Sequence, residues 1–304
     1  PRGDEEALAD FERAIELVAH YAWFGLVQAL RSLKRREEAI TAIDRHLATQ
    51  LDDQEALAER GEVYRMMGCF EEALEDFGRA IGINPSYVFA LVQRGRTYEH
   101  IGRHAEALAD FDVAVAAAPD DAWVLAHRGD LRLRLDVDAA ALDDLDQAVR
   151  LDPDDLFTLE VRARCHRRAG RYATAAEDIE RAMAADPDDL DIAFEHAMLV
   201  SRTTGLPEAR ERWTTFEELL AEHGDERDPQ TRAAGSIISR AALGDWAGAG
   251  RFLAELPAAR PYWEVVDHVV RALDDLAEAP GADRDRVAAL RTPLADLRAA
   301  LHMS

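Results

Sequence analysis

The chain has 304 residues, of which 60 are acidic and 36 are basic, and its formal charge is −24. This net negative charge opposes binding of nucleic acid or anionic lipid through the surface as a whole, and it favours basic partners. No apolar run approaches the roughly 20 residues that cross a bilayer, and the two lone cysteines, Cys69 and Cys165, predict no disulfide framework. We therefore expect a cytoplasmic protein that binds neither nucleic acid nor membrane.

The first predicted element is a helix from Asp4 to Val18, with Ala7, Phe11 and Ala14 on one stripe. It matches the second half of the 34-residue unit that recurs further along the chain, so its partner helix would precede the first residue. We interpret residues 1–19 as the second helix of a truncated repeat. A unit that begins midway also leads us to expect that this chain is part of a longer protein.

Residues 54–87 contain the clearest copy of the repeat. Residues 54–67 carry apolar and small side chains at helical spacing, and Gly68 follows, which predicts a turn because glycine readily adopts the left-handed conformation that ends a helix. A second amphipathic helix is predicted over 71–83. Pro85 closes the unit, since proline cannot continue a helix. The unit therefore reads as a helix–turn–helix.

The same residue types recur at intervals of 34 along most of the chain. Self-similarity at this period indicates stacked units, none of which can bury its apolar face alone. Asp136 stands where the other units carry the turn glycine, which aspartate tolerates at some cost. The recurring positions are Arg60, Arg94, Arg128 and Arg162; Gly61, Gly95 and Gly129; Ala73, Ala107, Ala141 and Ala175; and Pro85, Pro119, Pro153 and Pro187.

These positions resemble the tetratricopeptide repeat (TPR) family, whose consensus places small residues, an aromatic residue and a closing proline at these points. The resemblance implies an all-α fold, a right-handed superhelical α-solenoid of stacked helix–turn–helix repeats. Residues 224–229 are predicted to form an insert, and residues 264–304 two C-terminal capping helices that lack the signature. The predicted repeats are a TPR-like unit at 20–53, well-matched units at 54–87, 88–121, 122–155 and 156–189, a divergent unit at 190–223 and a TPR-like unit at 230–263.

Several local patterns could suggest chemistry but have simpler explanations. The Asp-rich turns at 119–121, 152–155 and 186–189 lack the alternating ligands and glycine bend of a calcium loop, so we interpret their aspartates as helix N-caps. His100 and His104 flank a turn and belong to no metalloprotease motif. No phosphate-binding loop or nucleophile elbow is present. We expect no catalytic residues, no metal and no cofactor.

The resemblance implies that the first helices of successive units line a concave groove. Its charged positions include six arginines and four acids, a local charge of about +2, which suits an acidic or amphipathic peptide. The competing interpretation is that the aromatic residues pack between units and the arginines pair with adjacent acids. The candidate groove residues are Phe89, Arg96, His100, Trp123, Arg134, Phe157, Arg164, Arg167 and Arg168.

The sequence thus predicts a non-catalytic scaffold that binds a protein or peptide partner through this groove. The alternative is a sensor or regulatory segment of a larger multidomain signalling protein, such as a nucleotide-dependent regulator or a protease-linked effector, in which the repeats contact a neighbouring domain. An enzyme accessory domain or a homotypic assembly scaffold remains a third possibility.

Overall fold

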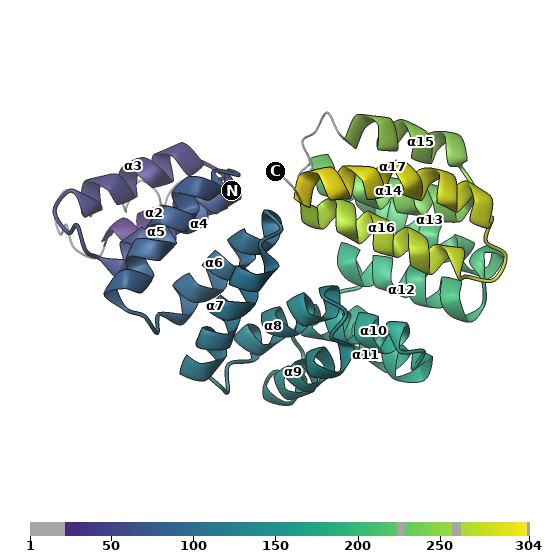
Figure 1. The fold of residues 1–304 in the computed structure, drawn as a ribbon, viewed down its shortest axis with the longest axis horizontal. Coiled ribbons are helices and arrows are strands. Elements are labelled where there is room, and N and C mark those ends of the chain that lie inside the picture. Colours follow the sequence, from purple (N-terminus) through teal and green to yellow (C-terminus); the bar gives the residue numbers. More distant parts are fainter. Residues whose placement is uncertain (1–21, 224–228, 257–262, 303–304) are drawn as a thin grey trace. The chain divides into compact units, whose positions relative to one another are not determined.

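A computed structural model describes residues 22–223, 229–256 and 263–302 of the chain (Figure 1). Within these ranges the regular elements are sixteen α-helices that pack pairwise as helix–turn–helix repeats, which confirms the predicted all-α fold. The superhelical sense and the exact repeat boundaries stay predictions. The helix predicted within residues 1–19 and most of the predicted insert lie outside the described residues.

The helices follow one another with short connections, and each first helix of a pair is followed by its antiparallel partner. Their bounds are α2 (Ala22–Ser32), α3 (Arg36–Leu47), α4 (Gln54–Met66), α5 (Phe70–Ile83), α6 (Val88–His100), α7 (His104–Ala117), α8 (Ala122–Arg134), α9 (Asp138–Leu151), α10 (Leu156–Arg168), α11 (Tyr172–Ala185), α12 (Leu190–Thr203), α13 (Leu206–His223), α14 (Pro229–Leu243), α15 (Trp246–Glu255), α16 (Trp263–Ala277) and α17 (Arg284–His302).

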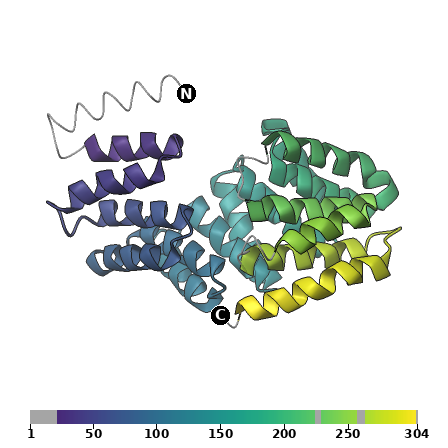
Figure 2. The ribbon, with the colours of Figure 1, turned by 90° about the horizontal axis from the view of Figure 1, so that it is seen from above.

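The chain divides into two compact units. Unit 1 comprises Pro1–Tyr98 and Ala105–Pro119, and unit 2 comprises Glu99–His104 and Asp120–Ser304. In unit 1 the helices α2 to α5 each pack against the next (Figure 2). In unit 2 the pairs from α8 to α17 repeat this arrangement, and α16 packs against both α12 and α14. An apolar core of unit 2 extends from α12 to α17.

The turn inside each repeat uses one left-handed residue. Gly68, Gly102 and Gly170 have φ of 76°, 76° and 71°, as the sequence predicts for a glycine that ends a helix. Lys34 and Asp136 occupy the equivalent places with φ of 58° and 60°. The backbone of these two residues therefore lies in the left-handed region, which non-glycine residues rarely adopt.

The aspartates that precede the first helices act as N-caps. Asp121 accepts hydrogen bonds from the backbone N–H groups of Trp123 and Val124, and Asp189 accepts from those of Asp191 and Ile192. Asp155 caps α10 in the same way. Each carboxylate thereby pairs donors that the first turn of a helix leaves open, so the N-cap interpretation is confirmed for the last aspartate of each turn, whereas Asp152 and Asp186 accept from backbone N–H groups within the turn.

The arginines at the repeat interval fix the two helices of one repeat to each other. Each guanidinium on a first helix donates two hydrogen bonds, of 2.6 to 2.9 Å, to an aspartate 16 residues later on the second helix. Such bidentate pairs combine charge with a fixed geometry. The four pairs are Arg60–Asp76, Arg94–Asp110, Arg128–Asp144 and Arg162–Asp178.

The small residue that follows each of these arginines allows the same two helices to approach. A Cβ atom added to Gly95 would lie 2.8 Å from the ring of Phe111, and one added to Gly61 would lie 2.9 Å from the ring of Phe77. These separations are below any normal carbon–carbon contact. The glycines are therefore required by the large side chain 16 residues later rather than by backbone conformation.

Candidate binding cavity

Six of the nine predicted groove residues line one cavity of about 570 Å³ in unit 2. The cavity is surrounded by the first helices of successive pairs, α8, α10, α12, α14 and α16, together with α13 and the end of α6. Its lining thus follows from the repeat, because stacking places equivalent faces of the first helices toward the same space. The predicted residues found there are His100, Arg134, Phe157, Arg164, Arg167 and Arg168.

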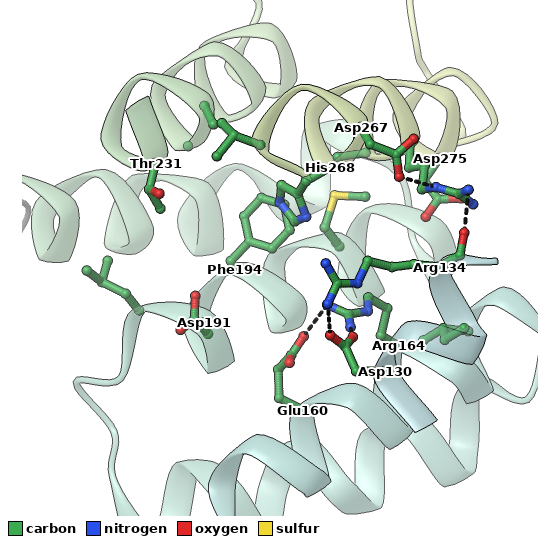
Figure 3. A pocket seen from close by; sticks show the side chains of 18 of the residues that line it. Asp130, Arg134, Glu160, Arg164, Asp191, Phe194, Thr231, Asp267, His268 and Asp275 are labelled. Atoms are coloured by element: carbon green, nitrogen blue, oxygen red, sulfur yellow. Dashed lines mark hydrogen bonds and ion pairs between the residues drawn. The ribbon is translucent and has the colours of Figure 1, made fainter. Parts of the chain in front are cut away.

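One wall of the cavity is apolar and continuous with the core. Phe194 and Met198 of α12 line it, and both belong to the cluster that joins α12 to α17. The Phe194 ring lies 5.6 Å from that of Trp213. It also lies 5.3 Å from the ring of His268, and Figure 3 shows these two side chains side by side. Because these side chains are fixed by the core behind them, this wall is already formed in the absence of a ligand.

An alternating series of charges runs from α6 to α10, and all of its members except Glu99 line the cavity. Arg134 donates to Glu99 at 2.7 Å and to Asp130 at 2.5 Å. Arg164 donates to Asp130 as well and to Glu160 at 3.1 Å (Figure 3). The series therefore contains three carboxylates and two guanidinium groups, and each arginine is shared between two acids.

Glu160 has the least ordinary environment of this series. Burial raises the pKa of its carboxyl to about 8, and the neighbouring Glu195, Asp191 and Asp130 add to the shift, against the lowering influence of Arg164. The dominant cause is desolvation, which disfavours the charged carboxylate. Near neutral pH this side chain can therefore hold a proton.

The two remaining arginines of α10 are held by other elements. Arg167 is buried and donates to Glu195 and to Asp275, in both cases at 2.5 Å. Arg168 donates to the carbonyl oxygen of Leu133 and to the carboxylate of Asp136, in both cases at 2.6 Å. The Arg167 guanidinium thus links α10 to α12 and α16, and the Arg168 guanidinium links α10 to the end of α8 and the turn after it.

The charge of the cavity differs from the value of about +2 that the sequence list gave. Five arginines and six carboxylates line it, so its formal charge is −1 when every carboxyl is ionised. The sequence count omitted the acid of α12, which lies in the divergent unit at 190–223, and the acids of α16, which lies outside the predicted repeats. The arginines pair with acids, as the competing interpretation expected.

Three predicted residues lie outside the cavity. Phe89 and Arg96 belong to unit 1, where the Phe89 ring lies 6.3 Å from that of Tyr87 and Arg96 donates to Gln93. Trp123 of unit 2 is 37% exposed. The Trp123 ring meets that of His127 edge-on at 5.1 Å, and the His127 ring lies 4.9 Å from that of Phe157. In unit 2 the predicted aromatic strip is therefore continuous only through His127.

Sequence reasoning missed the cavity residues contributed by α12. A signal for them exists in the repeat period, because the positions 34 residues after Phe157, Glu160 and Arg164 are Asp191, Phe194 and Met198. All three line the cavity. No such signal marks Asp267, His268 or Arg271 on α16, since the chain there has lost both the repeat register and its signature residues.

The fold defines a class of protein, an all-helical repeat protein, and in unit 2 the first helices of its described repeats surround a cavity. The family models agree with this class. Tetratricopeptide repeat models match residues 55–87 and, in two segments, residues 5–56 and 128–189. The chain belongs to the tetratricopeptide repeat family, whose repeats mediate protein–protein interactions. No curated protein matches it significantly.

Solved structures support the same fold. A tetratricopeptide repeat protein from Parabacteroides merdae superimposes with a TM-score of 0.54 at 15% identity, covering 95% of this chain and 99% of its own. PilW, described as a type IV pilus biogenesis factor, gives a TM-score of 0.54 at 20% identity, with 71% and 98% covered. At these identities the likeness concerns the fold alone.

Among the described residues no helix combines the length and the apolar character that a membrane span requires.

Proposed function

We propose that this chain is an interaction scaffold that binds a segment of a partner protein in the cavity of unit 2. The main support for this proposal is that side chains from five successive first helices line the same cavity of about 570 Å³. That volume lies in the range of roughly 300 to 1,000 Å³ typical of ligand pockets. It suits a few side chains of an extended segment.

The lining favours an amphipathic segment over a purely acidic one. The apolar wall around Phe194 and Met198 offers a surface for one or two large side chains of the partner. An acidic segment would have to compete with Asp130 and Glu160 for Arg164, which these acids already hold. A partner that combines apolar and polar groups matches both walls without breaking that series.

The test is selection of a random dodecapeptide library on the folded protein, followed by binding measurements with the selected peptides. We expect selected sequences that share at least one large apolar residue. Thr231→Trp, which would place a large ring in the lining of the cavity, and Phe157→Ala, which would remove part of that lining, should each weaken binding about tenfold or more, a loss of about 1.4 kcal/mol.

Gly82→Ala provides the matched control, because Gly82 lies on α5 in unit 1 with open space around it. Binding to this variant should equal binding to the wild type. The proposal fails if the library yields no peptide, or if the selected peptides bind the two cavity variants as tightly as the wild type while both variants keep the helical circular dichroism spectrum.

A further inference from the structure

Asp136 is the one residue of unit 2, among those described, that adopts positive φ without being glycine. It occupies the turn between α8 and α9, and the equivalent turn residue of the next repeat is Gly170. An aspartate in this conformation is less favourable than glycine. Strain of this kind persists where the side chain makes a contact that glycine could not make.

The Asp136 carboxylate joins two helices that are remote in sequence. It accepts a hydrogen bond from Arg168 of α10 at 2.6 Å and another from Arg271 of α16 at 2.7 Å. Arg271 also donates to the carbonyl oxygen of Arg134, at 2.6 Å. We call this contact of Asp136, Arg168 and Arg271 the clasp. It connects the α8–α9 turn to α16, and its two arginines line the cavity.

A second contact on α16 can separate without leaving a buried charge alone. Asp275 accepts from Arg167, but Arg167 is also held by Glu195 through two hydrogen bonds. The side chain of Asp275 is 31% exposed, whereas those of Arg167 and Glu195 are almost fully buried. If α16 moves away, Arg167 keeps its buried partner and Asp275 enters water.

We propose that the clasp holds α16 against the α8–α9 turn and that its opening admits the partner segment to the cavity. The second half of this statement rests on the proposed function, and the first half does not. The clasp suits such a role because Asp136 is 62% and Arg271 33% exposed, so water and salt compete for the contact. Because Val266, Val269 and Val270 hold α16 in the apolar core, the opening is a small displacement of the helix around Arg271 rather than a release of α16.

Hydrogen exchange of the backbone amides, followed by mass spectrometry, tests the clasp without any ligand. Asp136→Gly restores the residue that other turns use. It should speed exchange in α16 about 1.5- to 5-fold, the factor that corresponds to the contribution of an exposed ion pair. Exchange at the α8–α9 turn itself should slow, because the strain is relieved. A substitution that merely destabilised the repeat would speed both.

Lys34→Gly is the matched control, since Lys34 has the same strained conformation in unit 1. It relieves strain without touching the clasp and should leave exchange in α16 unchanged. Wild-type protein in 0.5 M NaCl should resemble Asp136→Gly in α16. Equal exchange in α16 of the wild type and Asp136→Gly overturns the clasp.

Peptides from the library selection test the gating half. Asp136→Gly should bind them with a faster association rate, by the same factor as the gain in α16 exchange. Faster exchange with an unchanged association rate overturns gating and leaves the clasp standing. If the library yields no peptide, the proposed function and the gating fail together, while the exchange result still decides the clasp by itself.

Discussion

At the residue scale, the smallest side chain of each repeat is matched to a large one 16 positions later. Gly61 faces Phe77 and Gly95 faces Phe111, each at a distance that excludes a methyl group. In the repeat that begins at residue 156 the corresponding pair is Ala163 and Ile179, which share one core cluster. Ala163 thus fits beside the branched Ile179, whereas a Cβ at Gly129 would lie 2.9 Å from Leu145, so the shape of the partner as well as its size decides which residue fits.

We predict that Gly95→Ala lowers the free energy of unfolding by about 1 to 3 kcal/mol, the usual cost of overpacking. Combining it with Phe111→Ile, which imitates the Ala163–Ile179 pair, should give a favourable coupling of at least about 1 kcal/mol in a double-mutant cycle. Urea unfolding followed by circular dichroism measures both values. Gly82→Ala, with open space around it, should instead stabilise the chain by about 0.5 to 1 kcal/mol. Additive effects of Gly95→Ala and Phe111→Ile would contradict the packing argument.

Glu160 predicts a pH dependence of stability with a definite sign. Burial raises the pKa of its carboxyl from 4.5 to about 8, so the folded state binds more protons than the unfolded state between these values. The stability that this group contributes is present below pH 4.5 and is lost as the pH rises toward 8. Glu160→Gln should abolish this component, which amounts to at most about 1.4 kcal/mol per pH unit. Parallel pH profiles of the variant and the wild type in urea unfolding would refute the assignment.

At the scale of the elements, the arginine–aspartate pairs fasten the two helices of each repeat. The aspartate is nearly buried in every pair, whereas the arginine is partly exposed. Removing one partner leaves the other charge without its counterpart in a poorly hydrated place, and removing both avoids that penalty. The pair therefore specifies the alignment of the two helices more than it adds net stability.

Asp110→Asn should lower the free energy of unfolding by about 1.5 to 3 kcal/mol, since Arg94 would lose its carboxylate. The double variant Arg94→Met with Asp110→Leu should recover most of this loss. Thermal and urea unfolding of the two variants and of the wild type measure the difference. A double variant that is less stable than Asp110→Asn would show that the pair contributes net stability instead.

The sequence was sufficient to predict the helix pairs between residues 54 and 189, because glycine, proline and apolar spacing agree in each unit. It also predicted the part of the cavity wall that lies on α8 and α10. The partners of the periodic arginines could also have been predicted, because four aspartates recur at the same interval: Asp76, Asp110, Asp144 and Asp178. The wall formed by α16 could not be predicted, because its position depends on long-range stacking and no repeat signature marks it.

At the scale of the whole molecule, neighbouring repeats stabilise one another, and the last helix pair covers a large apolar surface. Val266, Val269, Val270 and Leu273 of α16 are fully buried in the core of unit 2. In a repeat array each unit contacts its neighbours, so the loss of an end unit exposes the core of the next one.

We predict that removal of residues 263–304 increases amide hydrogen exchange in α12 and α14 at least about tenfold, because these helices lose the surface that α16 covers. Exchange in α4 and α5 of unit 1 should stay the same and provides an internal reference. Unchanged exchange in α12 and α14 would contradict the capping role predicted for the last two helices.

The contact between Asp136 and Arg271 also bears on how many repeats unit 2 can contain. The two residues are 135 positions apart, or about four periods of a 34-residue repeat. An open array tolerates the gain or loss of one unit, because only nearest neighbours interact. An array joined to itself does not, since one additional unit between α11 and α12 would carry Arg271 a full repeat away from Asp136. The contact between Asp136 and Arg271 therefore fixes the number of repeats in unit 2. Duplication of a repeat between these two residues would break the contact.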